Sequence, residues 1–400
     1  MSVKCDFCGR TVPAIPERDD DLMFLGGPNE NFSICGACIR SGFEIMKESS
    51  LQDSNIEGLP KDMNPRLLKD KLDEWIIDQD LAKKRLSIAV YDHYKRLTQP
   101  KTEEPIEKSN ILLVGSTGCG KTAIMKALAK ELNLPLYIED VTSITTTGYV
   151  GRSVDDILSG LLAEADGNLE LAQKGIILLD EGDKLRRTTG PNGAGGRDVK
   201  GEGVQQGLLK ITEGGVFTVN YKKVEYKMDT SNILFVLAGA FEGIESIISK
   251  RLNAKTKTVG GFTGSIASKT SIDYNKCIMD VKPEDLKDFG MMPELLGRFP
   301  IITPLQELSE EALVRILSEP KGSIVKQMIK SFKMDNVKLH FKKEALTLIA
   351  KKAKLRKTGA RALRSIVEEV IEDAKYVCPG SDIKEVIVKD DLSLEYIKEN

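Results

Sequence analysis

The segment that most constrains this chain is a glycine-rich stretch, Gly-Ser-Thr-Gly-Cys-Gly-Lys-Thr, at residues 115–122. It follows an apolar run, Ile111–Val114, and precedes a run of helix-forming residues, Ala123–Leu132. In a strand–loop–helix context, glycines let backbone N–H groups wrap phosphates, and the helix N-terminus favours negative charge. The pattern predicts a nucleotide-binding P-loop. A chance glycine-rich turn is the alternative, and it leaves the flanking strand and helix unexplained.

Each residue of this loop is predicted to contribute to ATP binding. Lys121 would reach the β- and γ-phosphates, and the Thr122 hydroxyl would bind Mg²⁺. Cys119 is interpreted as a small residue that takes no chemical part. The predicted loop residues are Gly115, Ser116, Thr117, Gly118, Cys119, Gly120, Lys121 and Thr122.

A second apolar run, Ile176–Leu179, ends in two acidic residues, Asp180 and Glu181. Asp180 would complete the magnesium shell. Glu181 would polarise the attacking water, which is the role of a general base. The alternative is a solvated strand end. The P-loop upstream favours the catalytic interpretation.

Short apolar runs alternate with helical segments between Ile111 and Ala240, which predicts a parallel sheet covered on both faces. After Pro304 helical patterns dominate, which indicates a smaller, mainly helical C-terminal domain. The glycine-rich stretch Gly190–Gly203 is predicted to be a loop. The candidate strands of the sheet are Ile111–Val114, Leu136–Ile138, Ile176–Leu179 and Ile233–Ala238.

Four of the seven cysteines form two Cys-x-x-Cys pairs near the N-terminus, Cys5 with Cys8 and Cys35 with Cys38. Such pairs suit a tetrahedral Zn²⁺ with four thiolate ligands and no open position, and so a structural site. Unligated cysteines or disulfides are the alternative. We therefore expect an N-terminal zinc-binding module at 1–48, a linker at 49–63, a large ATPase domain at 64–304 and a small domain at 305–400.

Composition narrows the functional classes. A chain of 400 residues, 41% hydrophobic and 30% charged, is expected to hold more than one globular domain. The net charge of −2 does not suggest a nucleic-acid or membrane partner. No apolar stretch approaches the ~20 residues of a membrane helix, and a cytoplasmic location is expected. With only two histidines, His93 and His340, a histidine general base is not expected.

Beyond the ATPase motifs, several segments resemble the ClpX family of AAA+ protein unfoldases. The resemblance covers nearly the whole chain: zinc module, P-loop large domain and small C-terminal domain. The segments that carry it are Tyr91–Leu97, Gly148–Gly151, Arg197–Gln206 and Lys357–Arg361.

The resemblance implies further site residues. Tyr149 and Val150 look like the pore loop that grips an extended polypeptide, although an ordinary turn is the alternative. Arg298 resembles the arginine finger, which reaches the nucleotide of the neighbouring subunit. Arg361 resembles the sensor-2 arginine; a surface ion pair is the alternative for either. Ile77 belongs to a segment that resembles the adenine-pocket lining, with Asp78 where the family usually has Gly.

The resemblance also implies partners: a homo-hexamer, unfolded or tagged protein substrates, and a ClpP-type peptidase. Three departures bear on them. In the docking tripeptide, which is aliphatic-Gly-Phe in the family, the aliphatic residue is here either replaced by Gly260 or shifted one place to Val259. An Arg-Lys-His loop is missing, and Lys222 and Lys223 keep only some of its charge. The gap between the cysteine pairs, Gly9–Ile34, is longer than usual.

Three functions are therefore weighed. An ATP-driven, ring-forming unfoldase that delivers substrates to a peptidase is the leading one. A remodelling chaperone that acts without a peptidase is favoured by Gly260 and the missing triplet. A nucleic-acid-associated ATPase is disfavoured by the near-neutral charge.

Overall fold

The computed structural model describes residues 3–12, 23–26, 32–42, 63–98, 104, 106–144, 152–186, 199–257, 273–356 and 358–398. The chain divides into two units, Met1–Asp62 and Met63–Asn400. Predictions that concern the linker up to residue 62 and the segments at 145–151 and 258–272, which contain Tyr149 and Gly260, lie outside the described residues.

The N-terminal unit contains two antiparallel strand pairs. Strand β1 (Val3–Lys4) pairs with β2 (Thr11–Val12), and β3 (Met23–Gly26) pairs with β4 (Phe32–Cys35). Residues 36–42 are helical and follow β4 directly. Asp6 joins the two pairs, because its carboxylate accepts hydrogen bonds from the Ser33 amide at 2.7 Å and the Ser33 hydroxyl at 2.9 Å.

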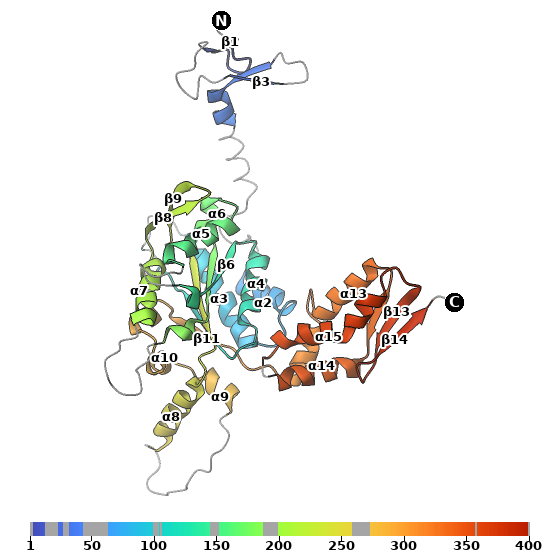
Figure 1. The fold of residues 1–400 in the computed structure, drawn as a ribbon. Helices are drawn as coiled ribbons and strands as arrows, with labels where there is room; N and C mark the ends of the chain where they lie inside the picture. The colour runs from blue at the N-terminus through green and yellow to red at the C-terminus, as the bar shows by residue number, and fades with distance from the viewer. Residues whose placement is uncertain are drawn as a thin grey trace. The chain divides into compact units, whose positions relative to one another are not determined.

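A five-stranded parallel sheet forms the centre of the second unit (Figure 1). All residues of β5 and β10 are buried, as expected of strands covered on both faces. This confirms the predicted α/β fold with a parallel sheet. In spatial order the strands are β11 (Ile301–Pro304), β5 (Ile111–Val114), β10 (Leu234–Gly239), β7 (Ile176–Asp180) and β6 (Leu136–Asp140).

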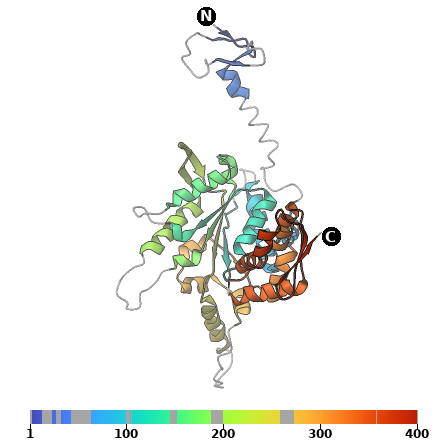
Figure 2. The same cartoon turned by 45° about the vertical axis from the view of Figure 1, so that its right-hand side comes forward.

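Helices cover both faces of this sheet. One group includes α2 (Pro65–Asp73), α3 (Asp80–Leu97) and α4 (Lys121–Leu132). On the other side lie α5 (Val154–Glu164) and α7 (Val199–Glu213), as Figures 1 and 2 both show. The other helical elements of this region are η2 (Val141–Ser143), α6 (Leu169–Gln173), η3 (Gly182–Leu185), α8 (Ile244–Lys257), α9 (Tyr274–Met279), α10 (Pro283–Phe289) and α11 (Pro293–Gly297).

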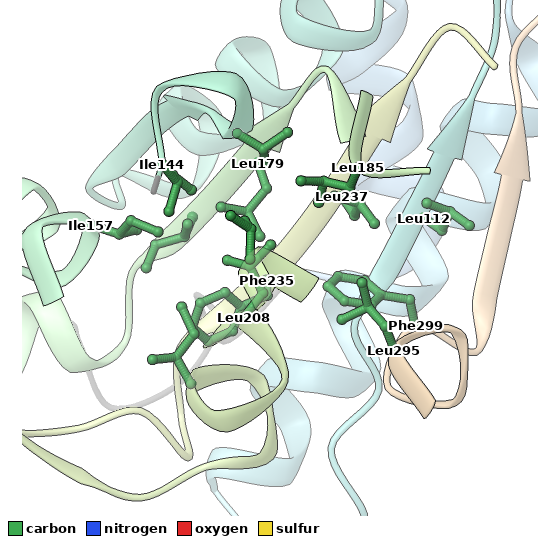
Figure 3. Packing of buried hydrophobic residues seen from close by; sticks show 14 of the residues in the cluster. Leu112, Ile144, Ile157, Leu179, Leu185, Leu208, Phe235, Leu237, Leu295 and Phe299 are labelled. Carbon is green, nitrogen blue, oxygen red and sulfur yellow. The ribbon is translucent and has the colours of Figure 1, made fainter. Parts of the chain in front are cut away.

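The main core lies between the sheet and the second group of helices (Figure 3). Leu179 and Phe235 project from β7 and β10, and Leu208 of α7 packs against them. Burial of a large apolar side chain stabilises a fold by about 1.5–3 kcal/mol. This core therefore holds the carboxyl ends of the strands, where the acidic residues lie, in fixed positions.

One prediction from the sequence needs correction. The predicted loop Gly190–Gly203 extends too far, because α7 begins at Val199. Gly201 lies in this helix close to η3, where an added Cβ would be 3.0 Å from the Leu185 carbonyl oxygen. Lys222 and Lys223, which stand in the region of the missing Arg-Lys-His loop, form the turn of a hairpin between β8 (Val216–Tyr221) and β9 (Val224–Asp229).

The C-terminal region is mainly helical, as predicted. Its core is built from the apolar faces of α12 (Glu310–Ser318), α13 (Ile324–Met334), α14 (Lys343–Leu355) and α15 (Arg361–Val377). A three-stranded sheet covers it, with β13 (Ile383–Val388) between β12 (Lys338–Phe341) and β14 (Leu394–Lys398).

Candidate nucleotide site and metal centre

The glycine-rich loop joins β5 to α4 and has the conformation that its glycines permit. Gly118 and Gly120 have φ of +79° and +109°, a region that residues with a Cβ rarely enter. Lys121 is buried at the start of α4, and its Nζ donates to the carbonyl oxygens of Gly115 at 2.6 Å and Ser116 at 3.1 Å. The lysine amine is thus held inside the loop, where phosphate oxygens could replace these carbonyls.

The magnesium-binding pair predicted from the sequence comes together. Thr122 Oγ1 donates to Asp180 Oδ2 at 2.9 Å, and the Asp180 Oδ1 accepts from the Glu181 amide at 2.9 Å. Glu181 follows β7 with φ of +59°, a left-handed conformation uncommon for a residue other than Gly. Hydroxyl and carboxylate oxygens are the donors that Mg²⁺ prefers, so this pair fits that ion.

A cavity of about 540 Å³ lies beside the loop. Its lining includes Ser116, Thr117, Gly118 and Cys119 from the loop and Leu313 and Lys354 from the C-terminal region. Burial raises the pKa of the Cys119 thiol, which agrees with a passive role for this residue. Tyr274 also lines the cavity, and its hydroxyl has no hydrogen-bond partner among the described residues.

The C-terminal region contacts the loop directly. The Ala360 amide donates to the Gly118 carbonyl oxygen at 3.2 Å. A Cβ on Gly118 would lie only 2.2 Å from the Thr358 carbonyl oxygen, so glycine is required for this approach. Arg361 follows this contact and begins α15, but it lines a separate hollow along that helix rather than the cavity beside the loop.

Arg298 lies at the end of α11 with its side chain 49% exposed. Its Nη2 pairs with Glu213 Oε1 at 2.7 Å, at the end of α7. The structure therefore does not place Arg298 in the nucleotide cavity of its own chain. This position is compatible with either a surface ion pair or a contact to another subunit.

The segment that contains Ile77 lies between α2 and α3, and Ile77 itself is buried. It does not line the cavity beside the loop. Its neighbours Asp78 and Gln79 have φ of +55° and +60°. Asp78 Oδ1 pairs with Arg315 Nη1 of α12 at 3.0 Å, which links the segment to the C-terminal region.

Sequence reasoning missed two buried polar residues that shape the site. The Gln79 amide nitrogen donates to the carbonyl oxygens of Cys119 at 3.2 Å and Gln306 at 2.7 Å. Asp183, in η3, accepts from the Ala240 amide at 2.9 Å, after the end of β10. No local pattern marks Gln79, whereas Asp183 follows the Asp180–Glu181 pair and could have been found by its position.

Tyr149 and Val150 lie outside the described residues, and so do Gly260 and Arg197. The roles of these residues stay predictions. The described residues that flank the Tyr149 segment are Ile144 and Arg152.

Four cysteine sulfurs gather in the N-terminal unit and lie within 4.8 Å of one another. The Sγ–Sγ separations are 4.0 Å between Cys5 and Cys38 and 3.8 Å between Cys8 and Cys35. A tetrahedral zinc with Zn–S bonds of about 2.3 Å requires sulfurs about 3.8 Å apart. The four side chains therefore fit such an ion.

The charge environment of these thiols also suits a cation. Backbone N–H groups, that of Cys8 foremost and that of Cys35 next, lower the pKa of Cys5 to about 6. The neighbouring thiols, Cys8 first, raise the pKa of Cys38 to about 12. Several thiolates at such short distances repel one another unless a metal ion compensates their charge.

The geometry defines a class of protein: a P-loop ATPase whose C-terminal region packs on the phosphate-binding loop. Comparison with known families agrees. Residues 106–302 match the model described as AAA domain (Cdc48 subfamily). Residues 308–376 match the model described as C-terminal, D2-small domain, of ClpB protein.

Comparison with curated proteins narrows the family. The ATP-dependent Clp protease ATP-binding subunit ClpX of Bacteroides fragilis is 43% identical, over 99% of this chain and 94% of that protein. The protein of the same name from Bacteroides thetaiotaomicron is 43% identical over 99% of this chain and 95% of its own length. The chain belongs to the ClpX family, as its motifs predicted, and it is an AAA+ ATPase that is not itself a protease.

Within the described residues, no helix combines the length and the apolar character needed to cross a membrane.

Proposed function

We propose that this protein is an ATP-driven, ring-forming unfoldase that threads polypeptides through an axial pore, in complex with a ClpP-type peptidase. The observation that carries the proposal is the match, over 99% of this chain, to relatives named ATP-dependent Clp protease ATP-binding subunit ClpX. The described site supports it, because it contains the parts that ATP hydrolysis needs.

In this proposal each residue has one task. Lys121 binds the β- and γ-phosphates, and the Thr122 hydroxyl and Asp180 carboxylate hold Mg²⁺, which neutralises phosphate charge. Glu181 accepts a proton from the attacking water. Arg298 stabilises the charge that develops on the nucleotide of a neighbouring subunit, and its exposure leaves it accessible for that contact. Arg361 reports the nucleotide state to the C-terminal region.

The threading activity is tested by unfolding of a fluorescent protein with an unstructured tail, in the presence of ATP. Tyr149→Ala should impair unfolding while ATP hydrolysis continues. Tyr376→Ala is a matched control, because that side chain is 89% exposed on α15. Normal unfolding by Tyr149→Ala would remove the pore assignment.

A Glu181→Gln variant should bind ATP without hydrolysing it and so retain its substrates. Immobilised on a resin, it should capture polypeptides, whereas the control Glu164→Gln, at an exposed position of α5, should not. Capture of DNA in place of polypeptide would instead favour a nucleic-acid-associated ATPase.

Gly260 bears on the coupling to a peptidase, because it replaces the aliphatic side chain that the family uses for docking. Docking of an aliphatic side chain in an apolar pocket contributes roughly 1.5–3 kcal/mol per subunit, and a ring multiplies that loss. Mixing with a ClpP-type peptidase should give ATP-dependent degradation. Unfolding without degradation would support the second candidate, a remodelling chaperone that acts alone.

For the N-terminal unit we infer a structural Zn²⁺ held by Cys5, Cys8, Cys35 and Cys38. Four thiolate ligands require a reducing location such as the cytoplasm. The metal would supply much of the folding free energy of this unit, because the described part has few buried apolar side chains.

A further inference from the structure

A buried carboxylate lies near the nucleotide site and takes no part in it. Glu139, near the carboxyl end of β6, has a side chain only 3% exposed. Its Oε2 accepts from Arg152 Nη1 at 2.8 Å and from the Tyr137 hydroxyl, and its Oε1 accepts from the Ser143 hydroxyl. Arg152 Nη1 also donates to the Tyr137 hydroxyl oxygen at 2.9 Å. All three partners therefore converge on one carboxylate.

Two of these partners, Ser143 and Arg152, stand on either side of the segment 145–151, which contains Tyr149. Ile144 and Arg152, the residues that flank the segment, form a parallel β-bridge. The Arg152 amide donates to the Ser143 carbonyl oxygen at 3.2 Å. Ser143 stands before the segment and Arg152 after it, so Glu139 binds a side chain from each end.

The same carboxylate is close in register to the magnesium-binding pair. Strand β6 pairs with β7, with Glu139 opposite Leu179 and Asp140 opposite Asp180. Asp180 in turn accepts the hydrogen bond from Thr122. Glu139, which binds the residues on either side of segment 145–151, and Asp180 of the nucleotide site therefore lie on neighbouring strands.

Arg152 also stands at the start of α5, since Ser153 is the N-cap of that helix. Ser153 and Asp156 form a capping box, with the Ser153 amide donating to Asp156 Oδ2 at 2.7 Å. The tie from Glu139 to Arg152 thus links a strand of the central sheet to a helix that covers it.

We propose that Glu139 and Arg152 form a positioning ion pair that holds Ser143 and Arg152, the described ends on either side of segment 145–151, against β6, the strand beside Asp180. The mechanical part of the inference rests on the proposed function, because it assigns polypeptide gripping to the segment. Arg152 is 59% exposed and its pair with Glu139 is partly screened. Loss of Arg152, however, leaves a buried carboxylate with hydroxyl partners only.

The test compares Arg152→Ala and Arg152→Lys in the full-length assembly. Arg152→Ala should lower the number of substrates unfolded per ATP hydrolysed roughly tenfold. The reason is that a gripping residue that is not held in its productive position loses much of its effect on the substrate. ATP hydrolysis without substrate, and its KM, should stay within about twofold of wild type. Arg152→Lys keeps the charge and should restore part of the coupling.

The matched control is Arg251→Ala. Arg251 Nε pairs with the buried Asp285 carboxylate at 2.7 Å, so its loss also leaves a buried carboxylate without its arginine. It should lower thermal stability to a similar degree as Arg152→Ala and leave unfolding per ATP unchanged. If Arg152→Ala has wild-type coupling, or if hydrolysis and unfolding fall in parallel in both variants, the ion pair has no positioning role.

Hydrogen exchange supplies a readout that does not depend on unfolding activity. The amide at position 152 bonds to the Ser143 carbonyl, so its exchange, corrected for intrinsic rate, should accelerate roughly tenfold or more in Arg152→Ala. Unchanged exchange would overturn the inference. If the wild-type protein unfolds nothing, while exchange at position 152 accelerates in Arg152→Ala, the proposed function is refuted and the ion pair stays in place.

Discussion

Thr122 Oγ1 donates a hydrogen bond of 2.9 Å to Asp180 Oδ2, which joins the first turn of α4 to the end of β7. These two oxygens are already adjacent in the fold, so Mg²⁺ needs little rearrangement to bind between them and a nucleotide.

Replacement of Thr122 by Val should remove one ligand while it keeps the shape of the side chain. A hydrogen bond or ligand at a charged group contributes about 1.5–3 kcal/mol, so ATP hydrolysis at limiting Mg²⁺ should fall at least about tenfold. Thr122→Ser should stay near wild type. Hydrolysis measured against Mg²⁺ concentration checks this, and an unchanged Mg²⁺ dependence of the Val variant would contradict the assignment.

Lys121→Ala should abolish ATP binding, because the amine that is now held by the Gly115 and Ser116 carbonyls is the group that would neutralise phosphate charge. Lys126→Ala, at an exposed position of the same helix, is the control for altered net charge. Binding of a fluorescent ATP analogue measures both. Retained binding by Lys121→Ala would refute the site.

Arg298→Ala should still bind ATP but hydrolyse it at least about a hundredfold more slowly, as expected for an arginine that stabilises phosphoryl transfer. If it acts on a neighbouring subunit, mixing it with inactive Glu181→Gln subunits should restore activity, because some interfaces then combine an intact Glu181 with an intact Arg298. Mixed assemblies without any recovery would mean that Arg298 acts within its own chain or only pairs with Glu213.

Metal analysis should find about one zinc per chain. A Cys5→Ser, Cys38→Ser double variant should contain none, and its N-terminal unit should lose its protection from proteolysis, because metal binding supplies the folding free energy. Cys277→Ser serves as the control, since Cys277 lies in α9, outside the cysteine cluster. Zinc retained by the double variant would exclude these ligands.

His93 gives a pH dependence of known sign. Burial foremost, with help from nearby Arg96 and Lys108, lowers its pKa to about 3 from 6.5. Between these values the unfolded state binds a proton that the folded state does not, so the free energy of unfolding falls as pH drops below 6.5. Its Nε2 lies 3.1 Å from the Asn232 carbonyl oxygen, a hydrogen bond that a glutamine amide could keep.

His93→Gln should therefore lose about 1 kcal/mol less stability than wild type between pH 7 and pH 5.5. Urea unfolding followed by fluorescence of the single tryptophan, Trp75, measures this difference. An equal loss in the two proteins would mean that His93 titrates as freely in the folded state as in the unfolded one.

The features that the sequence predicted correctly are those that depend on residues close together in the chain. Residues 115–122, the acidic end of β7 and the cysteine pairs are local patterns whose chemistry follows from residue type and spacing. Apolar runs predicted four of the five strands for the same reason. The fifth, Ile301–Pro304, is only four residues long and lies at the very end of the predicted large domain, where no strand was predicted.

Tertiary structure decided what depends on distant residues. Asp78 and Gln79 adopt left-handed conformations between α2 and α3, and contacts with Arg315 and Gln306 accompany them. Likewise α7 begins before its glycines suggest, because it packs against η3 and the core. The sequence by itself determined the class of chemistry, through residue types at short spacing. Only the fold could bring Arg152 to Glu139, because their pairing depends on the β-bridge that places Arg152 beside Ile144, soon after the end of β6.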